Sequence, residues 1–288
     1  MPDIAAVVRR LVSPEFDGKL MYHCHADEPY PSGEALREFI DIARAVVFPG
    51  FYGSNIDNAE MLEYHLGVRM ERLYQILCEQ LYAGLCFGEA ESICLQTQRD
   101  EAERIATAFI EYIPDLKLTL RTDVEAIYDG DPAAKNFGEV ILSYPGLRAI
   151  FNYRVAHFLL NAGASIIVPR MITEMAHSDT GIDIHPGATI DKWFAIDHGT
   201  GVVIGETSVL GDHVKLYQGV TLGAKSFPLD EQGNPIKGIA RHPILEDGVV
   251  VYAGATILGR ITIGRNAVIG GNTWVTEDVP ADDVVFNS

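Results

Sequence analysis

The sequence IGETSVLGDHVKLYQGVTL (204–222) decides the fold class, because it carries a large aliphatic residue at every sixth position. An α-helix repeats its buried face every 3.6 residues and an ordinary strand every two, so neither gives this spacing. A six-residue unit of a short strand and a turn does give it, with three units closing one coil of a β-solenoid. Across the C-terminal part of the chain, the aliphatic positions in this step are Ile184, Ile190, Ile196, Ile204, Leu210, Leu216, Leu222, Leu245, Val251, Ile257, Ile263, Ile269 and Val275.

Small or β-branched residues at a second fixed place in the repeat favour tight turns. Val214, Val220 and Ala255 each stand four residues after an aliphatic position. Each coil of a solenoid buries its apolar face only against the next coil, so the ends of the stack need a cap. We expect the N-terminal part of the chain to cover the first coil.

Residues before 180 show helical periodicity instead. Helical segments are expected over Leu36–Val47, from Leu62 to Gly84, from about Glu89 to Pro114, before Pro132, and from Leu147 to Gly163. The sequence therefore predicts an α + β protein. It has an α-helical domain over residues 1–180 and a parallel β-helix of hexapeptide repeats over residues 181–288.

Composition and charge exclude several classes of protein. The chain carries 40 acidic and 22 basic residues, a net charge of −18, which disfavours nucleic acid as a partner. No apolar run approaches the roughly 18 residues that span a bilayer, and the first residues do not resemble a signal peptide. We expect a cytoplasmic protein without a membrane partner, in which the four cysteines are reduced.

Two intervals interrupt the six-residue step, and each brings an ionisable pair. The first, between Ile196 and Ile204, contains Asp197-His198, and the second, between Leu222 and Leu245, ends in Arg241-His242. Insertions must leave the stack and often line a binding face. Asp183, which opens the repeat, is a third polar feature.

Each of these residues alone is more often a turn or surface residue. Together, however, the residue types indicate acid–base catalysis on a substrate with a carboxylate. Histidine accepts a proton near neutral pH, and a neighbouring carboxylate raises its basicity. The fork of an arginine suits a substrate carboxylate. We therefore single out His198 as a base, Asp183 as its orienting acid and Arg241 as a carboxylate clamp. Such a set suits activation of a small hydroxy- or amino-acid nucleophile.

With these motifs, residues 120–280 resemble the serine O-acetyltransferase family. The motifs are DIHPGATIDKWFAIDHGTGVVIGETSVLGD (183–212), GVTLG (219–223), RHP (241–243) and GATILG (254–259), with Asp131-Pro132-Ala133 before them. The resemblance implies a helical domain followed by a left-handed β-helix. It also implies acetyl transfer from acetyl-CoA to L-serine, the step that leads to cysteine, with no metal.

The resemblance also implies roles for individual residues. It makes His198 the catalytic base, paired with Asp183. It makes Asp131 and Asp197 the ligands of the serine ammonium group, and Arg241 and His242 the residues on the carboxylate side. Asp131 has no such meaning from its local sequence, where Asp-Pro indicates only the end of a helix. For acetyl-CoA, the resemblance suggests that Ala224, Ala253, Gly254 and Gly271 lie along the pantetheine arm. Backbone N–H groups near Gly223-Ala224 are expected to hold the oxyanion.

The implied partners are further copies of the chain, as a homotrimer or a dimer of trimers. Many members of the family bind cysteine synthase through a terminal isoleucine, whereas this sequence ends in Phe286-Asn287-Ser288, which leaves that partner open. The loop over residues 225–237 is longer than in the shorter members. It is expected to cover the site, to bring Lys225 and Lys237 to the phosphates of CoA, or to be solvated.

Three alternatives remain at this point. A hexapeptide acetyltransferase for a sugar or another small alcohol would keep His198 but has no use for Asp131 with Arg241. A β-helical zinc carbonic anhydrase would draw three ligands from His185, His198, His213 and His242. A solenoid scaffold without catalysis would turn over no acetyl-CoA.

Overall fold

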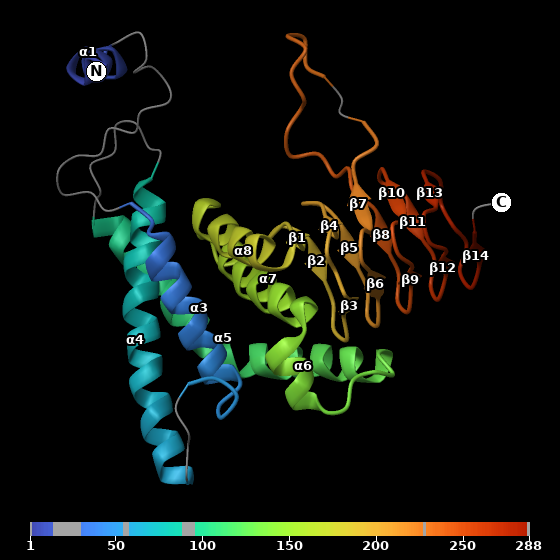
Figure 1. The fold of residues 1–288 in the computed structure, drawn as a ribbon, viewed down its shortest axis with the longest axis horizontal. Helices are drawn as coiled ribbons and strands as arrows, with labels where there is room; N and C mark the ends of the chain where they lie inside the picture. The colour runs from blue at the N-terminus through green and yellow to red at the C-terminus, as the bar shows by residue number, and fades with distance from the viewer. Residues whose placement is uncertain (1, 14–29, 54–57, 88–95, 227–228, 287–288) are drawn as a thin grey trace.

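The protein is described by a computed structural model that covers residues 2–13, 30–53, 58–87, 96–226 and 229–286 (Figure 1). Helices occupy the first part of the chain and a stack of short strands occupies the rest. The helices are α1 (Ile4–Leu11), α3 (Gly33–Val47), α4 (Ala59–Cys86), α5 (Gln96–Gly130), α6 (Phe137–Ser143), α7 (Pro145–Asn161) and α8 (Ile167–Thr180). None of the described helices is long and apolar enough to cross a membrane.

The helical periodicity predicts the buried faces well. In α3, the hydroxyl of Ser32 caps the N-terminus by accepting from the amide of Ala35 at 3.2 Å. All six apolar residues expected on its inner face, from Leu36 to Val47, are buried. Helix α7 ends at Asn161, close to the expected stop at Gly163.

The expected helix stop at Pro114 is wrong, because α5 runs through that residue to Gly130. Proline removes one backbone hydrogen bond and costs a helix interior about 3 kcal/mol. Ile113, Leu116 and Leu120 are buried on either side of the exposed proline. Their tertiary packing outweighs the local cost, a balance that periodicity cannot reveal.

The expectation of reduced cysteines is also wrong in part. Cys86, the last residue of α4, is disulfide-bonded, whereas Cys78 is free. Cys24 and Cys94 lie outside the described residues.

The C-terminal part is a three-sided parallel β-solenoid. One side, the first sheet, consists of β1 (Asp183–Ile184), β4 (Val203–Ile204), β7 (Thr221–Gly223), β10 (Thr256–Leu258) and β13 (Trp274–Val275). The second sheet consists of β2 (Thr189–Ile190), β5 (Val209–Leu210), β8 (Ile244–Leu245) and β11 (Thr262–Ile263). The third consists of β3 (Ala195–Asp197), β6 (Lys215–Tyr217), β9 (Val250–Val251), β12 (Val268–Ile269) and β14 (Val284–Val285).

The strand register confirms the six-residue repeat. Ile184 pairs with Ile204, which pairs with Leu222, so every third aliphatic position stacks on the one before. All the aliphatic positions predicted from the sequence are buried. The predicted fold class, a helical domain followed by a β-helix, is therefore confirmed.

Two of the edges between the sheets matter for function. The His198 edge is formed by the turns that join the third sheet to the first, beginning with residues 198–202. The Arg241 edge is formed by the turns that join the first sheet to the second, including residues 205–208 and 224–243. The inserted loop leaves the stack at the Arg241 edge and projects away from it (Figure 1).

Helices α5, α7 and α8 pack on the first coil and supply the expected cap. Asp123 on α5 and Arg154 on α7 form a buried ion pair at 2.6 Å. Arg154 also donates to the carbonyl oxygens of Ile190 and Asp191, and Asp123 accepts from the amide of Phe194. Helix α8 ends at Thr180 and β1 begins at Asp183, whereas the domain boundary between residues 180 and 181 stays a prediction.

We predict that Arg154→Met lowers the free energy of unfolding by about 3–5 kcal/mol, because it leaves the Asp123 carboxylate buried without its partner. Urea unfolding followed by circular dichroism measures the change. Arg121→Met is the matched control on α5, since Arg121 forms an exposed ion pair with Glu125. Equal losses in the two variants would contradict a special role for the buried pair.

Candidate active site

His198 stands at the start of its edge in a fixed backbone turn. Its φ is +54°, and the next residue, Gly199, has a φ of +93°. A Cβ atom on Gly199 would lie 2.4 Å from Cδ1 of Ile182, so only glycine fits there. The His198 side chain is 77% exposed and open to a substrate. His213 and Asn272 adopt a similar φ in other turns, so this conformation belongs to the turn type and is not itself a mark of catalysis.

Asp197 lies between a histidine and a lysine. Its Oδ1 is 3.8 Å from Nε2 of His198, and its Oδ2 is 3.3 Å from Nζ of Lys215. The lysine is on β6, directly above β3 in the third sheet. Lys215 could not be singled out from its local sequence, because it occupies an ordinary outward-facing strand position.

Asp131 joins this group from the helical domain. Its Oδ2 accepts from the hydroxyl of Tyr144 at 2.6 Å, and its Oδ1 accepts from the amide of Ala133 at 2.8 Å. The bond from Tyr144 holds the pKa of Asp131 below its usual value and raises the pKa of Tyr144 to about 12. Asp131, Tyr144, Asp197 and Lys215 line one small cavity. The structure therefore brings Asp131, Asp197 and His198 together.

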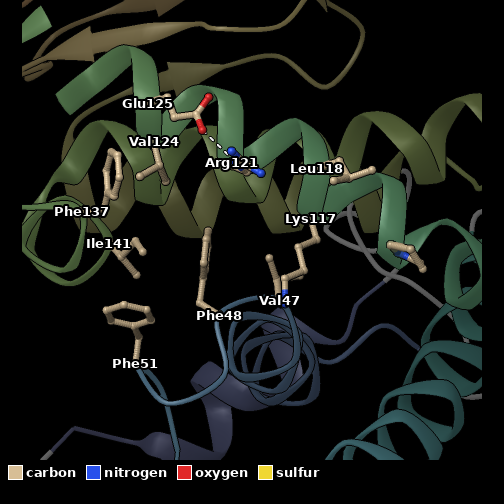
Figure 2. A pocket seen from close by; sticks show the side chains of 11 residues that line it. Val47, Phe48, Phe51, Lys117, Leu118, Arg121, Val124, Glu125, Phe137 and Ile141 are labelled. Atoms are coloured by element: carbon tan, nitrogen blue, oxygen red, sulfur yellow. Dashed lines mark hydrogen bonds and ion pairs between the residues drawn. The ribbon is translucent and has the colours of Figure 1, made fainter. Parts of the chain in front are cut away.

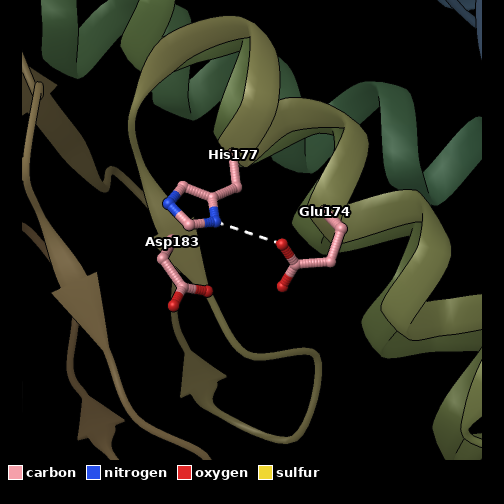
Figure 3. Close-up of side chains that lie close together, drawn as sticks. All are labelled: Glu174, His177 and Asp183. Carbon is pink, nitrogen blue, oxygen red and sulfur yellow. Dashed lines mark hydrogen bonds and ion pairs between the residues drawn. The ribbon is translucent and has the colours of Figure 1, made fainter.

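Asp183 has neighbours on α8 in this structure (Figure 3). Its carboxylate groups with Glu174 and His177, whose ligand atoms all lie within 4.8 Å of one another. Arg170 is 3.9 Å from Asp183 and also pairs with Glu174, so a cation of the protein already faces this cluster. Among the described residues, no hydrogen bond or ion pair joins Asp183 to His198. Their expected pairing stays a prediction.

The Arg241 edge holds a second group of predicted residues. Arg241 donates to Glu206 at 2.7 Å, and this bond holds the pKa of Glu206 below its usual value. His242 is 7% exposed, and its Nδ1 accepts from the amide of Thr207 at 3.0 Å. In the neutral ring the proton therefore sits on Nε2, which can donate to a carboxylate. Gly205 is required beneath the ring, because a Cβ there would lie 2.1 Å from Cδ2 of His242.

The two groups lie on opposite edges of the first sheet. Asp197 and His198 precede β4, whereas Arg241 and His242 follow β7 and precede β8. A strand of the first sheet, two residues long in β4 and three in β7, lies between the two edges. In the part of the chain that the structure describes, no hydrogen bond or ion pair joins Asp197 or His198 to Arg241 or His242, so the two groups are separate within one chain.

The residues expected to bind acetyl-CoA are also divided between the two edges. Ala253, Gly254 and Gly271 lie on the His198 edge, where Gly201, Gly219 and Gly254 stack closely on successive coils. Gly223, Ala224 and Lys225 lie on the Arg241 edge, at the base of the inserted loop.

Other parts of the described structure do not gather the predicted residues. A groove of about 730 Å³ between the end of α3, α5 and α6 is lined mostly by apolar side chains, among them Phe48, Phe51 and Leu118 (Figure 2). Its Arg121 and Glu125 pair with each other. His198, His213 and His242 stand on three different edges of the solenoid, so they do not meet at one point within a chain.

Burial lowers the pKa of His242 to about 4, and the nearby Arg241 guanidinium adds to this shift. The unfolded chain, with its histidine near 6.5, then binds more protons than the folded chain below that pH. We predict that this residue contributes stability above pH 6.5 that is lost as the pH falls towards 4. NMR titration of the His242 ring, assigned with His242→Gln, tests the pKa, and a midpoint near 6.5 would contradict the prediction.

Known proteins resemble this chain in sequence and in fold. The family described as bacterial transferase hexapeptide (six repeats) matches residues 242–277. A relative from Synechococcus elongatus named serine acetyltransferase, plasmid, is 46% identical over 273 residues, which cover 92% of this chain and 85% of the relative.

Solved structures of serine acetyltransferases have a similar fold. Entamoeba histolytica serine acetyltransferase 1 in complex with L-cysteine has a TM-score of 0.76 and 35% identity, covering 92% of this chain and 91% of that chain. Neisseria gonorrhoeae serine acetyltransferase in complex with serine has a TM-score of 0.57 and 26% identity, covering 92% of this chain and 98% of that chain. With nearly half of its residues identical over most of its length to a relative of that name, this chain belongs to the serine acetyltransferase family.

Proposed function

We propose that this chain transfers the acetyl group of acetyl-CoA to the hydroxyl of L-serine. The observation that carries the proposal is the position of two carboxylates, Asp131 and Asp197, beside the exposed imidazole of His198. Carboxylates bind the ammonium group of an amino acid, and the imidazole can then reach its hydroxyl. A sugar offers no ammonium group to this acidic cavity. The relatives named serine acetyltransferase support the same substrate.

The proposed reaction needs one base and no covalent enzyme intermediate. His198 takes the proton of the serine hydroxyl while its oxygen attacks the thioester carbonyl. Collapse of the tetrahedral intermediate breaks the carbon–sulfur bond, and the imidazolium returns the proton to the leaving thiolate. Asp197 faces the imidazole in this structure, and Asp183 is the partner implied by the family.

The carboxylate of serine is proposed to bind at Arg241 and His242. The guanidinium offers two parallel donors, and the neutral imidazole offers its Nε2 proton. Glu206 already accepts from Arg241 and holds it in place at this edge. The substrate would therefore meet cationic and neutral donors at one end and carboxylates at the other.

A complete serine site requires two copies of the chain. The support for this proposal is the separation of His198 and Arg241 on opposite edges of one sheet. In a ring with rotational symmetry, the His198 edge of one copy can face the Arg241 edge of the next. We therefore propose a homotrimer or a dimer of trimers. The column of small residues on the His198 edge would let the pantetheine arm of acetyl-CoA approach the coils in the same cleft.

Further properties are proposed from the sequence. The cytoplasm is the proposed compartment. Lys225 is proposed to meet a phosphate of CoA, since it lies exposed at the base of the inserted loop.

We predict that the purified protein releases free thiol from acetyl-CoA in the presence of L-serine, and that His198→Ala lowers kcat by about 10²- to 10⁴-fold. His213→Ala is the matched control, because His213 has a similar positive φ at another edge and is expected to retain most of the activity. A panel of acceptor alcohols accompanies the assay. Equal turnover with a sugar, or an active His198→Ala, would contradict the proposal.

A mixing experiment tests the site between copies. His198→Ala and Arg241→Ala are each expected to be nearly inactive alone. When the two are co-expressed in equal amounts and assemble at random in a ring, about a quarter of the sites receive both intact residues. Thiol release should then recover to about a quarter of the wild-type rate. A mixture as inactive as its components would show that each site lies within one chain.

A further inference from the structure

Lys215 carries a largely buried positive charge at the proposed active site. Its side chain is 16% exposed. Nζ donates to the carbonyl oxygen of Gly130 at 2.7 Å, lies 4.5 Å from the centre of the Tyr217 ring, and is 3.3 Å from Oδ2 of Asp197. Burial disfavours the charged form, but Tyr217 and Asp197 together raise the pKa of Lys215 above its usual value. The ammonium group is therefore held in place and remains charged at neutral pH.

Asp197 connects this lysine to the proposed base. Its two carboxylate oxygens point to different groups, Oδ2 towards Lys215 and Oδ1 towards His198. A carboxylate next to an imidazole favours the protonated ring, and a cation on the other side of that carboxylate weakens the effect. Lys215 thus both fixes the direction of Asp197 and offsets its charge.

Other charged groups around His198 show why compensation of the Asp197 charge by Lys215 matters. Asp131 approaches from the end of α5 with Tyr144 hydrogen-bonded to it, and its negative charge interacts with His198. On β1, Asp183 lies beside Arg170. Without Lys215, the ring would face two uncompensated carboxylates, Asp131 and Asp197. With Lys215, the cavity keeps one net negative charge, which matches a single substrate ammonium group.

We infer that Lys215 is a positioning residue for the proposed reaction, which holds Asp197 against His198 and offsets the charge of that carboxylate. This inference rests on the proposed function for its catalytic meaning. The charge relation among Lys215, Asp197 and His198 can be measured without turnover.

NMR titration of the His198 ring tests the inference directly. Lys215→Met removes the cation and leaves the charge of Asp197 uncompensated beside the imidazole, so the midpoint of the His198 titration should move upward. The acid limb of kcat/KM for serine should move in the same direction. Lys192→Met is the matched control, since Lys192 is exposed at a different edge. In this variant the midpoint of the His198 titration and the acid limb of kcat/KM should both stay at their wild-type values.

A second variant keeps the test valid if Lys215→Met does not fold. Lys215→Gln keeps a donor for the carbonyl of Gly130 but carries no charge, and it should show the same upward shift. An unchanged His198 midpoint in the folded variants would overturn the inference, even if the wild type acetylates serine. Conversely, a wild type inactive with serine would overturn the proposed function, while the titration would still report on the charge relation.

Discussion

The buried ion pair between Arg154 and Asp123 sets where the solenoid begins relative to the helices. The guanidinium joins α7 to α5 and donates to two carbonyl oxygens of the first coil, and the carboxylate accepts an amide of the same coil. A first coil with no neighbour before it would expose its edge. This pair covers that edge with helices and fixes their position, which also brings Asp131 to the third sheet.

The proposed chemistry depends on that placement and on the three-sided shape of the solenoid. The helical domain supplies Asp131 and Tyr144, and the coils supply Asp197, His198 and Lys215. Arg241 and His242 lie on the far edge of the first sheet. One side of the solenoid keeps the two groups apart within a chain, and the proposed serine site therefore combines residues of two copies.

The sequence predicted the structure correctly where apolar residues recur at the spacing of buried positions. The aliphatic step of six located β1 to β13 but not β14, and the helical faces located the buried side of α3. Prediction from the sequence failed at Pro114, where packing of Ile113 and Leu116 outweighs a local cost, and at Cys86, which is disulfide-bonded. It also missed Tyr144 and Lys215, because these residues matter only through their contacts with Asp131 and Asp197, and the contact of Lys215 joins it to a different strand.

The sequence by itself determined the hexapeptide solenoid, its two interruptions and the family, because each is written in the order and spacing of residues along the chain. Only the tertiary structure decided which ionisable residues meet. It joined Asp131 to Asp197 and His198, gave Asp183 neighbours on α8, and inserted Lys215 behind the carboxylate. The physical reason is that charge interactions act over a few ångströms of space, and folding alone determines which residues come that close.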